Sequence, residues 1–370
     1  MKKSQISIQF NWVFILIVGG IILLFFVGLG VKVKDVHQSS VDVSTKESFN
    51  TILAGVTNSP EEAAMIIELP RTEINFECQP NDGFSGYIIG SGQQAIGELP
   101  FFAPESVNSE FLTAWTVAWK VPYEVTNFLY ITSRENRYII IKDSSELYKE
   151  LNKTLKSKRL NADDPRMFFN KEVVDDSSIS SLENEGENKV HFVYFADPDC
   201  SPPQVPPDFD SMARNDLTAL CINPSQEEDF MDYYGNLTFY EYYGGQFVKV
   251  GSHPYLGKAS ILGGIIAGSV QMYQCGMENA FERLSYISFV NQKRSEKMET
   301  QMYGDCATVF TTAARLYGFI HDRTADFNFE NVQDIFEIGY EGYTGGGTYN
   351  GNNLLDTNYF SRGKSCGPIY

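Results

Sequence analysis

The residues best suited to chemistry form a short acidic segment, Asp197-Pro198-Asp199, directly after the apolar run VHFVYF. Open α/β sheets place their sites at the carboxyl ends of strands, so two carboxylates here could bind a metal or act as acid and base. His253, in a Gly-Ser-His-Pro turn, could supply a third group. This interpretation gives an alternative function for the chain, a hydrolase with its site near Asp197, Asp199 and His253.

A simpler interpretation makes the same segment a turn. Asp hydrogen-bonds its own backbone and Pro presets φ, so Asp-Pro-Asp is good turn chemistry. The adjacent Cys200 cannot be a nucleophile if it is oxidised, and His191 in the preceding run suits a packed core position. The chain has 4 histidines and no G-x-S-x-G, H-E-x-x-H or EF-hand pattern. The favoured prediction is therefore a protein that is not an enzyme and holds no metal and no cofactor.

Two other features could serve binding. The glycine-rich stretch TGGGTYNGN, residues 344–352, lacks the Lys-Ser/Thr pair of a phosphate-binding P-loop, so we expect a flexible surface loop there. The aromatic run YYGNLTFYEYYGG, residues 233–245, is dense enough to mark a contact edge. Most aromatic side chains in a body of this size are core residues, so Trp115, Trp119, Tyr242, Tyr243 and Tyr349 are expected inside.

The cysteines follow the N-terminal apolar segment, at Cys78, Cys200, Cys221, Cys275, Cys306 and Cys366. An even number without a C-x-x-C pair predicts three disulfides formed in an oxidising compartment and gives no support to a zinc site. Six cysteines allow 15 pairings, of which the short separation favours Cys200 with Cys221. Cys275 and Cys306 lie near the starts of successive helices, which antiparallel packing would place at opposite ends. Cys366 is therefore a candidate partner for either one.

An uncharged, mostly apolar stretch from Trp12 to Val31 predicts a transmembrane helix. As a helix, roughly 20 residues cross a hydrocarbon core of about 30 Å. A cleaved secretion signal has a shorter apolar region and a small-residue exit site, which the following GLGVKVKD lacks. We therefore expect a single-pass signal-anchor in the cell membrane, in contact with lipid through residues 12–31. The N-terminus would be cytoplasmic and the cysteine-bearing body extracytoplasmic.

The residues just before this stretch, KKSQISIQ from Lys2 to Gln9, resemble the class III signal of archaeal type IV pilin-like proteins. The resemblance implies cleavage between Ser4 and Gln5 by a prepilin-type peptidase, and pilin-like or cell-surface protein partners. Two positions depart from the family pattern, because Ser4 stands where Gly or Ala is usual and Gln9 where Glu is usual. An amide cannot neutralise a neighbour's N-terminal amine in lipid, so filament assembly and a lone surface protein both stay open.

The N-terminal residues and the rest of the chain differ in charge. Residues 1–34 hold four lysines and no acid, whereas residues 35–370 hold 25 basic and 47 acidic groups, a balance of −22. A body this acidic repels a phosphate backbone, which excludes nucleic acid as a partner. Its segments TNFLYITS and YQCGMENAFERL resemble uncharacterised single-span archaeal surface proteins, and that resemblance implies no activity.

The body predicts an α+β fold, with a mixed β/α ectodomain that ends in a helical, disulfide-stapled part. The regions are a signal and transmembrane anchor (1–34), a juxtamembrane helix and β-rich region (35–142), a mixed β/α region (143–254) and a helical region (255–370). Residues 35–57 predict the juxtamembrane helix, with Phe49, Ile52, Leu53 and Val56 on one face. Short apolar runs separated by Gly, Pro, Asn and Asp predict the strands of the β-rich region, among them MIIELP, INFECQ and a hairpin of FLYIT with YIIIKD.

Helical spacing predicts the remaining elements. Asp143 and Glu146 are expected to cap a helix with Leu147, Leu151 and Leu155 on one face. Another helix is expected near residues 209–219. The acidic segment 175–188 is poor in large apolar residues and predicts an exposed loop. Beyond it, ASILGGIIAGSV is too short to span a bilayer and predicts a core helix. Together these observations predict a membrane-anchored surface protein that acts by binding or by assembly.

Overall fold

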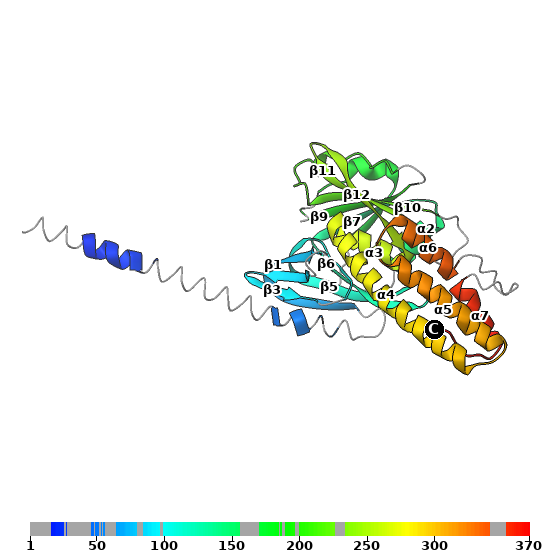
Figure 1. Ribbon diagram of the computed structural model, residues 1–370. Coiled ribbons are helices and arrows are strands. Elements are labelled where there is room, and N and C mark those ends of the chain that lie inside the picture. Colours follow the sequence, from blue (N-terminus) through cyan, green and yellow to red (C-terminus); the bar gives the residue numbers. More distant parts are fainter. Residues whose placement is uncertain are drawn as a thin grey trace, which may run out of the picture.

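The fold is a mixed α/β architecture with two β-sheets and a group of C-terminal helices beside them (Figure 1). The predicted class was α+β with a transmembrane helix. The observed class differs, since four strands of the second sheet run parallel. The computed structural model describes residues 16–25, 27, 46–47, 49–51, 53, 55, 64–79, 84–96, 99–155, 170–184, 186, 189–196, 200–225, 234–340 and 353–370.

The first sheet is antiparallel except at one edge, and its order is β3-β2-β1-β5-β6-β4. Its strands are β1 (Ala64–Gln79), β2 (Phe84–Ile89), β3 (Gly92–Ala95), β4 (Phe101–Phe102), β5 (Ser106–Lys120) and β6 (Glu124–Ser133). The predicted runs MIIELP and INFECQ form one strand, because β1 resumes its pairing with β5 after an irregularity between Glu68 and Thr72. Such a bulge accommodates Pro70, which cannot donate to the ladder.

A helical segment covers this sheet, as the sequence predicts for part of the 35–57 region. The described residues between Lys46 and Gly55 are helical. Phe49 is fully buried, with its ring centroid 4.6 Å from that of Tyr87. Leu53, one turn further on, is buried as well. The apolar spacing that predicted the helix face therefore corresponds to a real contact with the first sheet.

The second sheet has the order β12-β11-β10-β9-β7-β8. Its strands are β7 (Asn136–Ile141), β8 (Asn170–Val174), β9 (Lys189–Phe195), β10 (Leu217–Pro224), β11 (Tyr234–Tyr243) and β12 (Gln246–Leu256). The strands β8, β7, β9 and β10 are parallel, and β11 and β12 add an antiparallel hairpin. Side chains of β7, β9 and β10 are buried on both faces of the sheet, which explains their continuous apolar runs.

The predicted hairpin of FLYIT with YIIIKD is wrong. FLYIT belongs to β6 in the first sheet, whereas YIIIK begins within β7 in the second. The short turn at Arg134-Glu135 therefore carries the chain from one sheet to the other. Both runs are uniformly apolar because each strand is buried among its own neighbours, and a local pattern cannot tell this from a paired hairpin.

Two further local predictions need correction. The helix expected near residues 209–219 is replaced by the start of β10 at Leu217, which pairs with β9 and β11. The acidic segment predicted as an exposed loop contains a 3-10 helix, η2 (Asp176–Ser181), which buries Ile179 against the second sheet. In both cases tertiary pairing and burial override a polar local composition.

The helices agree with the predicted spacing. They are α2 (Glu146–Leu155), α3 (Gly257–Ala267), α4 (Val270–Gln301), α5 (Asp305–Arg323), α6 (Phe329–Tyr340) and α7 (Leu354–Gly363), with a second 3-10 helix η3 (Pro207–Phe209). The three leucines of α2 are buried, as predicted. The predicted core helix is α3, which contacts strands of both sheets. A Cβ at Gly264 would collide with Leu237, so glycine permits this close approach of helix to sheet.

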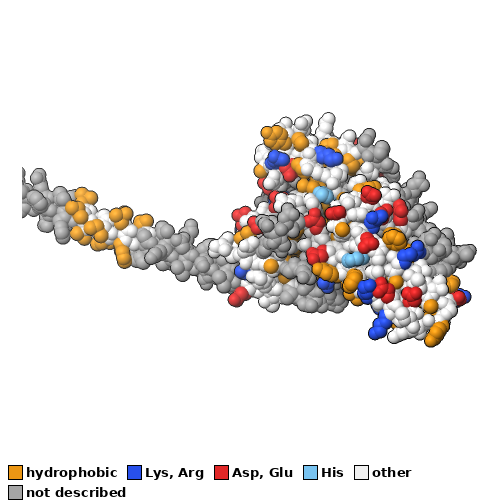
Figure 2. Space-filling model, viewed as in Figure 1, with side chains coloured by type: hydrophobic (Ala, Val, Ile, Leu, Met, Phe, Trp, Pro, Cys, Tyr) orange, Lys and Arg blue, Asp and Glu red, His pale blue; other side chains and the backbone are white. Residues whose placement is uncertain are grey.

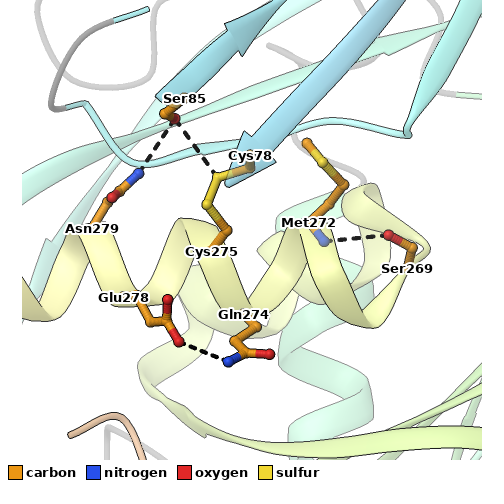
Figure 3. The surroundings of a disulfide bond; sticks show 8 residues. All are labelled: Cys78, Ser85, Ser269, Met272, Gln274, Cys275, Glu278 and Asn279. Carbon is orange, nitrogen blue, oxygen red and sulfur yellow. Dashed lines mark hydrogen bonds between the residues drawn. A yellow bond between two sulfur atoms is a disulfide. The ribbon is translucent and has the colours of Figure 1, made fainter. Parts of the chain in front are cut away.

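Three disulfides join the six cysteines, as the sequence predicts. The favoured pair Cys200–Cys221 is confirmed, and Cys366 pairs with Cys306. The third disulfide, Cys78–Cys275, fixes the end of β1 to α4 (Figure 3). Beside it, Ser85 of β2 accepts a hydrogen bond from the Asn279 side-chain amide at 3.3 Å. Disulfide and hydrogen bond together attach the long helix α4 to the first sheet.

The prediction of a transmembrane helix over residues 12–31 is wrong, and so is the single-pass membrane location that follows from it. No helix in the described part of the chain is long and apolar enough to cross a membrane. The described residues 16–25 of this region are helical. Their apolar side chains are exposed and stand apart from the body in Figure 2.

Candidate ligand-binding cleft

The parallel strands of the second sheet create a topological switch point. The strands β7 and β9 are neighbours in the sheet. The chain leaves β7 through α2 and returns as β8, next to β7 on the side away from β9. It leaves β9 and returns as β10, next to β9 on the side away from β7. Because the strands are parallel, the carboxyl ends of β7, β8, β9 and β10 meet at the same edge. In open α/β sheets the crevice at such an edge, between strands whose connections diverge, is the usual ligand site.

A cleft of about 320 Å³ lies at this edge, and we call it the switch-point cleft. It is lined by Ile141, Lys142, Asp143, Asp176, Tyr194, Phe195, Ala196, Ser201 and Pro203. These residues come from the ends of β7 and β9, from the segment after β8 and from the segment after Cys200. The volume is within the range of about 300–1,000 Å³ that small-molecule sites occupy.

The charged groups of the cleft are held by the strand ends. Lys142 Nζ lies 2.9 Å from each carboxylate oxygen of Asp175, so its charge is paired. Asp143 Oδ2 accepts a hydrogen bond from the Ser145 backbone N–H at 2.7 Å. The Ser145 hydroxyl in turn accepts from the Tyr148 N–H at 3.3 Å, which caps α2. The start of α2 therefore orients the Asp143 carboxylate, and the sequence prediction that Asp143 begins this helix is close.

Tyr194 forms part of the cleft wall and carries a buried hydroxyl. Its side chain is 6% exposed, and its hydroxyl lies beside that of Tyr240. The neighbouring Tyr240 hydroxyl donates to the backbone carbonyl of Cys200. Burial raises the pKa of Tyr194 well above its usual range, and Tyr240 raises it further. Tyr194 is therefore neutral at physiological pH.

The segment after Cys200 is anchored at several points. The disulfide to Cys221 fixes it to β10, and Tyr240 holds the Cys200 carbonyl. Further along, Phe209 of η3 is fully buried, with its ring centroid 5.9 Å from that of Phe192. These contacts position Ser201 and Pro203 at the cleft.

Of the residues predicted for hydrolysis or processing, only His253 lies within the described part of the chain. Asp197 and Asp199 lie outside the described residues, as do Ser4 and Gln5, so the hydrolase and processing predictions stay predictions. His253 on β12 shares a register row with Phe195, through Leu237 and Ile222. Three strand spacings of about 4.8 Å separate His253 from the end of β9 by about 14 Å.

His253 itself has a packing role. Its ring stacks on Phe327, with the centroids 6.0 Å apart and the planes 7° from parallel. Burial lowers the pKa of His253, and the charge of Glu278 partly opposes this effect. No group of three or more metal-ligating side chains occurs in the parts of the chain that the structure describes.

Another histidine, missed by the sequence, lies beside a serine. Ser285 Oγ on α4 is 2.9 Å from His321 Nδ1 on α5. A nucleophilic serine needs donors aimed at the developing oxyanion. Ser285 lies inside a helix, where backbone N–H groups are bonded to carbonyls one turn earlier. The pair therefore joins two helices and lacks the donors of an acyl-transfer site.

The predicted aromatic positions are mostly in the core. Trp115, Trp119 and Tyr242 are buried, whereas the prediction is wrong for Tyr243, which is 65% exposed at the tip of the β11–β12 hairpin. Tyr349 lies outside the described residues. The residues that line the switch-point cleft were not predicted, apart from Asp143 as a helix cap. The available signal was the position of Asp143 and Asp176 after the apolar ends of β7 and β8.

Comparison with known proteins adds nothing to this geometry. No family model, no curated protein and no solved structure matches the chain.

Proposed function

We propose that this chain is a binding protein and that the switch-point cleft takes a small polar ligand. The observation that carries the proposal is a cleft of about 320 Å³ with a mixed apolar and polar lining, at the point where the strand connections diverge.

The surroundings of Tyr194 support a preformed site. The wall on one side is β7 with Asp143, fixed by the start of α2, and on another side is the disulfide-anchored segment after Cys200. Rigid walls favour binding because less freedom is lost when the ligand enters. The mixed lining of apolar and polar side chains also matches the usual composition of small-molecule sites.

A blocking variant tests the proposal. We expect small polar probes to shift the 19F resonance of Tyr194 in protein labelled with 3-fluorotyrosine, with the resonance assigned by Tyr194→Phe. Ala196→Trp places an indole in the cleft and should abolish the shifts, whereas Ala325→Trp, at an exposed position beyond α5, should leave them unchanged. Glucosamine, glucose, tyramine and 4-ethylphenol are suitable probes. The proposal fails if none of them shifts the Tyr194 resonance, or if Ala196→Trp binds them as the unmodified chain does.

A further inference from the structure

We propose that the exposed face of α4 binds a second copy of this chain, in an antiparallel dimer with two-fold symmetry. The surface concerned, which we call the α4 stripe, consists of Glu282, Tyr286, Phe289, Val290, Lys293 and Lys297. All six side chains are exposed, with exposed fractions of 58% for Tyr286, 45% for Phe289 and 59% for Val290. None of these residues lines the switch-point cleft, so this surface is independent of the proposed ligand site.

The α4 stripe lies opposite the buried face of its helix. At 3.6 residues per turn, its members fall within an arc of about 100° around the helix axis. Phe281 and Leu284 point to the other side, where they belong to the hydrophobic core. In Figure 1, α4 (yellow) crosses the visible face of the molecule, and Figure 2 shows apolar and charged side chains together on that face. The stripe is therefore open to a partner.

The centre of the stripe is apolar. Tyr286, Phe289 and Val290 follow one another within about one turn of the helix. Single exposed apolar residues are normal on a protein surface, whereas neighbouring ones mark contact sites. The Phe289 ring also lies 5.5 Å from the His321 ring, centroid to centroid, and the Lys293 ammonium lies 5.5 Å from its centroid. These contacts hold Phe289 in place while nearly half of its side chain stays exposed, which makes it a preformed anchor for a partner.

The charge of the stripe changes sign along the helix. Glu282 lies at its N-terminal end, and Lys293 and Lys297 lie at its C-terminal end. Lys293 also forms an exposed ion pair with Glu296 at 2.8 Å, so the charge of Lys297 dominates at that end. In a parallel pair of helices each residue would face its own copy, and like charges would meet at both ends. In an antiparallel pair acid meets base at both ends, so charge complementarity favours a second, antiparallel copy of α4.

One antiparallel register matches the whole stripe with itself. In a two-fold contact residue i meets residue j while j meets i, so facing residues must be equally far from the centre of the stripe. The facing pairs are then Phe289 with Val290, Tyr286 with Lys293, and Glu282 with Lys297. The central pair is apolar, the next places an ammonium against an aromatic ring, and the outer pair is an ion pair. A shift of one turn would leave Val290 and Lys297 opposite residues outside the stripe.

Sedimentation velocity on the full chain tests the dimer. The contact is smaller than the 20–30 residues per side of a stable interface, so we expect a dissociation constant above about 1 μM and dimers between about 1 and 500 μM. Val290→Asp places two carboxylates at the apolar centre and should weaken dimerisation at least about tenfold. Val248→Asp makes the same change at an exposed valine of β12 and should dimerise as the unmodified chain does. Circular dichroism checks that each variant is folded.

Charge reversal tests the register. Glu282→Lys and Lys297→Glu each bring like charges together at both ends of the dimer, so each variant alone should dimerise about tenfold more weakly. An equimolar mixture of the two should form heterodimers as readily as the unmodified chain dimerises, because each reversed charge then faces an opposite one. The two positions are about four turns apart on one helix, so rescue in the mixture requires contact between copies. Glu110→Lys, an exposed carboxylate on β5, is the control for net charge and should have no effect.

Three results would overturn the proposed dimer. The first is a full chain that stays monomeric at about 500 μM. The second is association that Val290→Asp leaves unchanged, which would place the contact elsewhere, for example on the exposed apolar side chains of residues 16–25. The third is weakening by both charge reversals without rescue in their mixture, which would exclude the antiparallel register. Ligand binding at the switch-point cleft is unaffected by any of these results.

Discussion

The buried histidine of the second sheet should make the protein sensitive to mild acid. His191 on β9 is 4% exposed, with its ring stacked on Tyr138 at a centroid distance of 5.0 Å. Its Nδ1 lies 2.6 Å from the Thr218 hydroxyl, and Gly268 at the end of α3 closes over the ring. Burial lowers the pKa of His191 to about 3, with a smaller contribution from the charge of Lys189. The imidazole is therefore neutral in the folded protein.

The magnitude follows from the difference in pKa between the two states. In the unfolded chain His191 has its ordinary pKa of 6.5, so the unfolded state takes up a proton first as the pH falls. This contribution to stability is fully present above pH 6.5 and is lost between pH 6.5 and about 3. At about 1.4 kcal/mol per pH unit, the free energy of unfolding should fall by about 2 kcal/mol between pH 7 and pH 5 from His191 alone.

Urea unfolding at pH 7 and pH 5 measures this loss. His191→Gln cannot titrate, so its free energy of unfolding should fall by about 2 kcal/mol less than that of the unmodified chain over the same interval. Thr218→Val removes the hydrogen bond and keeps the burial, so it should retain most of the pH dependence. Equal losses in His191→Gln and the unmodified chain would refute the reasoning, as would an NMR titration of His191 near pH 6 in the folded protein.

Three further predictions concern other parts of the chain. Gly268→Ala should lower the free energy of unfolding by more than about 2 kcal/mol in urea titrations, because φ is +63° and the new methyl would collide with the histidine beneath it; unchanged stability would contradict this close approach. Replacing Cys200 and Cys221 together by Ser should destabilise the fold by about 2–4 kcal/mol and weaken probe binding at the switch-point cleft, whereas binding as strong as before would separate the disulfide from the site. Co-expression with a prepilin-type peptidase should yield chains that begin at Gln5, as read by mass spectrometry, and an intact bond after Ser4 would count against the pilin-like signal.

The sequence predicted the elements that local periodicity defines. The helix face of Leu147, Leu151 and Leu155 and the buried strand VHFVYF are both present, because burial of one stripe or one run leaves a direct trace in the sequence. The pair Cys200–Cys221 was also accessible, since few residues separate its members. The sequence carries no such local signal of which distant segments pair with each other. The disulfide between Cys78 and Cys275, with 197 residues between its ends, depends on how the first sheet meets α4.

The unpredicted cleft follows from one incorrect strand pairing. The rule that strand ends carry sites was applied to VHFVYF, and it would have applied equally to YIIIKD, which ends in Asp143. Interpreting YIIIKD as half of a hairpin removed it from the parallel sheet, so Asp143 became only a helix cap. Once β7 lies between β8 and β9, the residues after Ile141 and Val174 must share an edge with the end of β9. The site therefore depends on which sheet the strand joins. The apolar run does not carry this information, because it fits both interpretations.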